Sequence, residues 1–350
     1  MSGRREFLRL AAALGVSHAL ALRARPAFAS DPFALGVASG YPRPDGMVLW
    51  TRLVGGFDHG QVPVRWELSS NENFSSVVLS GSATATADWA HSIHVEPRGL
   101  APDRWYWYRF HAGDATSAVG RTRTAPAAGA AVPRLRFAFA SCQQYEQGWY
   151  TAHRHLAAED LDLVVFLGDY IYESSWGREH VRKHEGGEPY TLREYRARYA
   201  HYKSDPDLQK SHAAFPWVVT WDDHEVDNDY AADRPEDGMP RERFLARRAA
   251  AYRAYYEHMP LPASMRPSGP DMRIYTHLDW GRLARFLVVD DRQYRAPQAC
   301  PARPGGSTVA DPATCAEIDD PGRSMLGAAQ EAWLEREFAR SQAGWNILAQ

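Results

Sequence analysis

The feature that most constrains this chain is a set of four short apolar runs, each ending in residues that can bind metals or transfer protons. The runs cover residues 135–140, 163–167, 217–221 and 283–289. Runs of this kind are typical of strands covered on both faces, as in a sheet flanked by helices, and the expected helices cover residues 148–159, 191–202 and 241–257. Because ligands bind beyond the carboxyl ends of such strands, we expect the four run ends to form one shared site.

The preceding part of the chain has a different character. Short stretches of β-branched and aromatic residues, separated by Gly, Pro, Asn and Asp, cover residues 47–51, 62–68, 92–95 and 104–110. Their spacing predicts a small β-sandwich of the immunoglobulin or fibronectin type. The Ala-, Pro- and Gly-rich stretch at residues 125–133 predicts a linker, so we place two domains at residues 30–130 and 131–350.

Residues 1–29 carry the ordered features of an export signal. The pair Arg4-Arg5 precedes an apolar stretch at residues 10–22, and Ala27-Phe28-Ala29 has the pattern of a cleavage site. This order is typical of twin-arginine export, and an ordinary amphipathic helix is the alternative. The apolar stretch is shorter than the roughly 20 residues that a membrane span needs. We therefore expect a periplasmic or secreted protein that uses the twin-arginine export machinery and has no stable membrane span.

Charge and cysteine usage limit the partners further. A formal net charge of −3 gives no field that attracts nucleic acid, so we do not expect nucleic acid as the main partner. Cys300 and Cys315 lie in a Pro- and Gly-rich stretch and could close a loop as a disulfide. Two free thiols are the alternative, which an oxidising compartment disfavours. Cys142 is then unpaired, and an unpaired Cys in an exported protein needs an explanation.

Asp169 and Tyr172 follow the second apolar run. Gly168 allows the sharp turn that lifts the Asp169 carboxylate out of the strand end. A carboxylate can bridge two metal ions, and a phenolate is a hard anionic ligand suited to a trivalent ion. Taken alone, Asp169 could be a residue that caps a turn. The surrounding segment favours a metal ligand instead.

Cys142 ends the first apolar run. A free Cys is most often a small buried apolar residue, which is the alternative reading of this position. Next to the Gly-Asp-x-x-Tyr segment, its thiolate becomes a suitable metal ligand. Together with a tyrosinate it would favour Fe3+ over Fe2+ by donating negative charge.

The third run leads into Asp222-Asp223-His224-Glu225. One of these carboxylates can hold a second metal, and His224 can donate a proton to a leaving oxygen. The alternative is a solvated acidic turn in which Glu225 or Asp227 caps a helix.

After the fourth run, the Arg292 guanidinium can bind phosphate oxygens in bidentate fashion. An internal ion pair between Arg292 and an adjacent Asp is an equally good interpretation.

The chain resembles the PhoD-like alkaline phosphatases, a branch of the calcineurin-like metallophosphoesterases. The resemblance rests on residues 137–142, 166–173 and 221–225 in this order, with a helix at 324–334 and a strand at 345–350. It covers nearly the whole chain. It implies an α/β metallophosphoesterase-type β-sandwich flanked by helices, preceded by a small all-β fibronectin-like domain. The activity that it implies is hydrolysis of phosphomonoesters and phosphodiesters at alkaline pH.

The same resemblance implies a metal centre. Cys142, Asp169 and Tyr172 would hold Fe3+, and Asp169 with Asp223 would hold Ca2+, unless another pair of metals is used. His224 lies at the position of the catalytic His of metallophosphoesterases. We expect a metal-activated water to attack phosphorus in line, with Arg292 stabilising charge and His224 protonating the leaving group.

One departure from the family concerns the end of the chain. Family members carry further metal ligands, in a Gly-Asp-x-His segment and a later His or Asn, downstream of the position of Gln350. We therefore expect a C-terminally truncated chain with an incomplete metal shell, which would bind metal poorly. The alternative function is that of a non-catalytic exported binding protein with a degenerate phosphatase domain.

Overall fold

The computed structural model describes residues 28–57, 60–302 and 311–350. Most of the twin-arginine segment lies outside these residues, so the structure does not bear on it. Within the described residues, no helix combines the length and the apolar character that crossing a membrane requires. The disulfide predicted between Cys300 and Cys315 is confirmed, with a Cα–Cα distance of 5.8 Å.

A central six-stranded sheet contains three of the four apolar runs. Its strands, in spatial order, are β5 (Ser92–Val95), β2 (Gly46–Arg52), β1 (Val37–Arg43), β11 (Pro216–Thr220), β10 (Leu163–Leu167) and β9 (Phe137–Ala140). Strands β9, β10 and β11 run parallel to one another. Strands β10 and β11 are almost entirely buried, as their uninterrupted apolar sequences predicted. Their carboxyl ends therefore meet at one edge of the sheet.

The fourth apolar run does not join this sheet, so the expectation of one sheet for all four runs is wrong. Strand β13 (Ala284–Val288) lies between β12 (Thr276–Trp280) and β14 (Trp345–Ala349) in a second sheet. The two sheets pack face to face, with the rings of Phe137 and Phe286 5.1 Å apart. An uninterrupted apolar run indicates that both faces of a strand are buried. A strand that packs between another sheet and a helix is buried on both faces, whichever of the two sheets it belongs to.

The end of β13 nevertheless reaches the end of β11. The Thr220 hydroxyl donates to the carbonyl of Val289 at 2.8 Å, and the Trp221 indole donates to Asp290 at 3.0 Å. The residues after the fourth run are thus brought to the same edge as those after the other three. The expectation of a shared position is confirmed at the level of the loops, although the strand belongs to another sheet.

The N-terminal part is all-β, and it shares the central sheet. A third sheet contains β4 (Val77–Thr86), β3 (Gln61–Ser69), β6 (Trp105–Ala112) and β7 (Ala115–Thr116), with β8 (Gly120–Arg123) paired to β6. Its apolar face packs against β1, β2 and β5. Strand β1 also pairs in parallel with β11, with Ser39 opposite Pro216. The sheet therefore continues past the predicted linker at residues 125–133, which itself contains no strand or helix.

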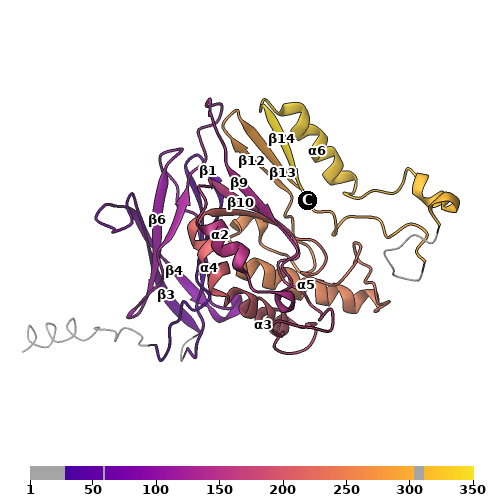
Figure 1. Ribbon diagram of the computed structural model, residues 1–350, viewed down its shortest axis with the longest axis horizontal. Coiled ribbons are helices and arrows are strands. Elements are labelled where there is room, and N and C mark those ends of the chain that lie inside the picture. The colour runs from indigo at the N-terminus through magenta and orange to yellow at the C-terminus, as the bar shows by residue number, and fades with distance from the viewer. Residues whose placement is uncertain (1–27, 58–59, 303–310) are drawn as a thin grey trace, which may run out of the picture.

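In the part of the chain that the structure describes, five α-helices cover the sheets. They are α2 (Thr151–Ala157), α3 (Leu192–Lys203), α4 (Pro206–Ala214), α5 (Arg241–His258) and α6 (Ala328–Arg340). Helices α2, α3 and α5 match predicted helices, whereas α4 was not predicted. Its start is set by Asp205, which caps the amides of Asp207 and Leu208, and by Pro206 in the first turn. Figure 1 shows α2 to α5 gathered beside the central sheet and α6 on the second sheet.

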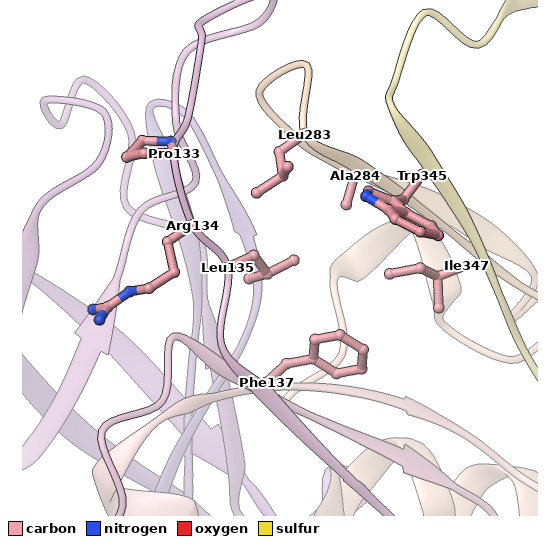
Figure 2. Close-up of a pocket in the computed structure, with 8 residues that line it drawn as sticks. All are labelled: Pro133, Arg134, Leu135, Phe137, Leu283, Ala284, Trp345 and Ile347. Carbon is pink, nitrogen blue, oxygen red and sulfur yellow. The ribbon is translucent and has the colours of Figure 1, made fainter.

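An apolar groove of about 460 Å³ opens between the two stacked sheets. It lies at the amino ends of β9, β13 and β14, and Figure 2 shows its lining of Pro133, Arg134, Leu135, Phe137, Leu283, Ala284, Trp345 and Ile347. The groove is therefore at the opposite end of these strands from the residues predicted to form the site. It contains no acid, His or Cys that could serve the expected chemistry.

Replacement of Trp50 tests how firmly the N-terminal strands are joined to the rest. Its fully buried indole donates to the carbonyl of Glu257 in α5 at 3.0 Å and lies under the Lys203 ammonium at 4.3 Å. We expect Trp50→Ala to lower the free energy of unfolding by about 3–5 kcal/mol in urea denaturation. The control is Trp345→Ala, because this side chain is 69% exposed and should change stability by less than about 0.5 kcal/mol. Equal stability of the two variants would contradict the shared core.

Candidate metal centre

The loops after β9 and β10 are hydrogen-bonded to each other. The amide of Cys142 donates to the carbonyl of Gly168, and the amide of Gln143 donates to that of Asp169, both at 3.1 Å. Cys142 and Asp169 have positive φ values of 58° and 55°. This left-handed conformation costs a non-glycine residue roughly 1–2 kcal/mol, and such strain is concentrated at functional sites. The two side chains are thus turned out of their strands at neighbouring points.

Gly168 has the role that the sequence predicted. Its φ is 101°, and a Cβ at this position would lie 2.4 Å from the amide nitrogen of Asp222. Only glycine allows this close approach of the loops after β10 and β11 together with the positive φ. The absence of a side chain at position 168 therefore brings Asp169 next to the acidic segment that follows β11.

Asp169, Asp223 and His224 form the centre of the site. Each offers one ligand atom, and these atoms all lie within 4.8 Å of one another at buried positions. The Tyr172 hydroxyl donates to Asp169 Oδ2 at 3.0 Å. Asp169 Oδ1 is buried and has no hydrogen-bond partner among the described residues. A buried carboxylate oxygen without a donor is costly, and a cation is a suitable partner for it.

The pKa values of these groups are consistent with a crowded, buried site that carries excess negative charge. Burial raises the pKa of Asp169 to about 6, while His224 opposes this effect and Asp223 and Asp222 add to it. Burial and the charges of Asp169 and Cys142 raise the pKa of Tyr172 far above its ordinary value. A bound cation would reverse both effects by stabilising the anions. The donor set therefore fits a metal ion.

Cys142 lies at the rim of this centre. Its thiol interacts electrostatically with Asp169 and Tyr172, and partial burial together with the Asp169 carboxylate raises its pKa. Its Sγ is not one of the ligand atoms that lie within 4.8 Å of one another. Cys142 thus adjoins the cluster, and its role as a ligand stays a prediction.

His224 is oriented by a residue that the sequence analysis did not assign. Glu173 Oε2 lies 2.7 Å from His224 Nδ1, which leaves Nε2 for the centre. The His224 ring also stacks on Tyr172 with a centroid distance of 4.1 Å. Burial disfavours the imidazolium, but Glu173, Asp223 and Asp169 outweigh burial and raise the pKa of His224 to about 9. His224 therefore carries a proton at neutral pH and can act as an acid.

A second unassigned residue, Glu225, connects the two loops that carry the carboxylates. Its fully buried side chain accepts from the amide of Tyr170 at 2.6 Å and from the amide of Asp222 at 3.0 Å. From the sequence, Glu225 was expected to be either a helix cap or one of several carboxylates that could hold a metal. No pattern in the sequence could have shown that its partners include Tyr170, because that contact depends on the neighbouring strands.

Arg292 is placed against the acids of the loop after β11. Its guanidinium pairs with Asp222, lies 3.5 Å from Asp223 and lies 3.8 Å from Asp229. The ion-pair interpretation expected a partner among the acids next to Arg292 in the sequence, Asp290 and Asp291. The observed partners are different residues. Arg292 therefore adjoins the candidate metal-binding cluster, and its contact with a phosphate stays a prediction.

Together, the fold and the site define an α/β protein of two stacked sheets with a candidate metal centre at the carboxyl ends of its strands. Comparison with known proteins identifies the family. The family model described as PhoD-like phosphatase matches residues 137–350, and its N-terminal domain model matches residues 18–126. The chain belongs to the PhoD-like phosphatase family.

Two relatives illustrate the similarity. Alkaline phosphatase D of Bacillus subtilis (strain 168) is 51% identical over 345 residues, which are 95% of this chain and 58% of that protein. A solved structure described as PhoD matches with a TM-score of 0.87 and 50% identity, over 92% of this chain and 63% of that chain. The chain thus spans less than two thirds of the length of either relative.

Glu225→Gln tests whether Glu225 sets the spacing of the two loops. The amide side chain has one acceptor, so its NH2 group would face a backbone N–H and one loop would shift. We expect metal affinity to fall roughly 10–100-fold, as measured by calorimetric titration. Glu159→Gln, at an exposed position, is the matched control and should bind metal like the parent. Unchanged affinity in Glu225→Gln would show that the loops hold their positions without it.

The pKa of His224 can be measured directly in metal-free protein. We expect the ring to titrate near pH 9 by NMR, and Glu173→Gln to move this pKa downward because the carboxylate is removed. Since the folded pKa exceeds the ordinary value of 6.5, His224 stabilises the fold fully below about pH 6.5. That contribution disappears as pH rises through about 9. A titration that Glu173→Gln leaves unchanged would refute the assigned cause.

Proposed function

We propose that this chain is the greater part of the catalytic machinery of a metal-dependent phosphoester hydrolase that acts on phosphomonoesters or phosphodiesters. The observation that carries the proposal is the buried Asp169 oxygen without a donor, at the centre of an acid and imidazole cluster. The similarity to alkaline phosphatase D supports the same reaction class. Because the chain spans only part of that relative, the activity of the whole protein is part of the proposal.

We propose Fe3+ and Ca2+ as the metals, with another pair of cations as the alternative. Cys142, Asp169 and Tyr172 offer sulfur and oxygen donors suited to the ferric ion, and Asp169 and Asp223 offer oxygen donors suited to calcium. When bound, such cations polarise phosphate oxygens and supply a nucleophilic water. Within the described part of the chain, one oxygen of Asp169 accepts from Tyr172 and the other has no donor. The second oxygen would therefore be available to hold a cation.

His224 and Arg292 have separate roles in this proposal. His224 gives the proton on Nε2 to the leaving oxygen, while Glu173 keeps the ring in place through Nδ1 and stabilises its protonated form. Arg292 holds its positive charge beside Asp223, where it can stabilise negative charge on the phosphoryl group. Its three carboxylate partners fix the direction of the guanidinium.

The proposal extends to the location and the domains of the protein. The Arg4-Arg5 segment supports twin-arginine export to the periplasm or the exterior. The β4-β3-β6 sheet packs on β1, β2 and β5 across an apolar core, and this arrangement supports a fibronectin-like N-terminal domain. The two stacked sheets with flanking helices support a metallophosphoesterase-type second domain.

Hydrolysis of p-nitrophenyl phosphate and bis(p-nitrophenyl) phosphate, with metal analysis of the same sample, tests the function. We expect His224→Asn to lower kcat about 10²–10⁴-fold with metal content unchanged, because a general acid is lost. Asp169→Asn should lower both metal content and turnover. Asp160→Asn, at an exposed position, is the control. If the parent chain is fully loaded with metal and hydrolyses neither ester, the proposed enzymatic function is refuted.

A further inference from the structure

An exposed tryptophan stands beside the candidate proton donor. The Trp176 indole meets the His224 ring edge to face, with a centroid distance of 5.3 Å and an interplanar angle of 80°. It meets Tyr172 in the same way at 6.4 Å. Although it packs on two site residues, Trp176 remains 44% exposed. A large apolar surface is thus presented to solvent at the edge of the site.

One hydrogen bond holds the indole in place, and a second contact holds the backbone that carries it. Its Nε1 donates to the Ser174 hydroxyl at 2.7 Å, and the backbone carbonyl of Trp176 lies 2.8 Å from His180 Nε2. An aromatic side chain has few rotatable bonds, and these contacts restrict them further. A ligand that stacks on a fixed ring loses little free energy to ordering it. Trp176 is therefore better suited to binding than a freely moving surface residue.

The position of Trp176 determines which part of a substrate it would meet. In the proposed reaction His224 protonates the oxygen that leaves, so the group attached to that oxygen passes next to His224. The ring that flanks His224 at the surface is Trp176. An uncharged indole offers no ion pair to that group. It offers a flat apolar face, on which a planar ring can stack.

We propose that Trp176 is a substrate-binding residue that selects phosphoesters with a planar aromatic leaving group. The inference rests on the proposed function, because it uses the role of His224 as proton donor. Trp176 does not take part in bond making in this scheme. Its contribution is to bind the aromatic group and to hold it beside His224.

Two phosphonates that are not hydrolysed separate this binding from catalysis. Phenylphosphonate and methylphosphonate carry the same anionic head, and only the first has a ring. We expect the metal-loaded parent chain to bind phenylphosphonate more tightly in calorimetric titration. Trp176→Ala should weaken phenylphosphonate binding roughly three- to tenfold, the range of one aromatic contact, and leave methylphosphonate binding unchanged. Trp176→Phe should retain most of the preference.

The control variant is Trp345→Ala, which removes a more exposed indole at the amino end of β14, away from the site. It should bind both phosphonates like the parent. If Trp176→Ala weakens both phosphonates equally, the residue only supports His224 and the inference is overturned. Equal affinity of the parent for both phosphonates also overturns it while leaving the proposed function intact. If the metal-loaded parent binds neither phosphonate, the proposed function fails together with the inference.

Discussion

The site depends on the parallel pairing of β10 with β9 on one side and β11 on the other. This pairing brings the three strand ends to one edge, and the amides after β9 then donate to the carbonyls after β10. Gly168 lets the loop after β11 come within contact distance of the loop after β10. Glu225 joins these two loops through backbone amides. The cluster is therefore positioned by backbone geometry together with one buried side chain, that of Glu225.

The electrostatics of the cluster follow from this crowding. Burial raises the pKa of Asp169, and repulsion from the carboxylates of Asp223 and Asp222 acts in the same direction, against the opposing charge of His224. The structure contains two responses to the excess negative charge, the imidazolium of His224 and the guanidinium of Arg292. Neither of these donates to Asp169 Oδ1, which remains the position where a cation would gain most.

The sequence predicted the elements of the fold better than their assembly. Buried strands such as β10 are recognisable because their apolar residues are consecutive, and the residues that follow them indicated the site. Membership of a sheet is set by distant partners, so the placement of β13 in a second sheet and of β1 beside β11 could not be read locally. Glu173 and Glu225 were missed for the same reason, since their importance arises from contacts across the fold.

The pairing of β1 with β11 joins two strands that are far apart in the order of synthesis. Ser39 is synthesised long before its partner Pro216. The edge of β1 therefore stays unpaired during translation until β11 has emerged from the ribosome. Pairings between such distant residues form slowly because a long loop must be closed first. During this interval β1 exposes an unpaired edge that could pair with another chain. The early part of the nascent polypeptide therefore carries a strand edge that is open to pairing with other chains until β11 has been made.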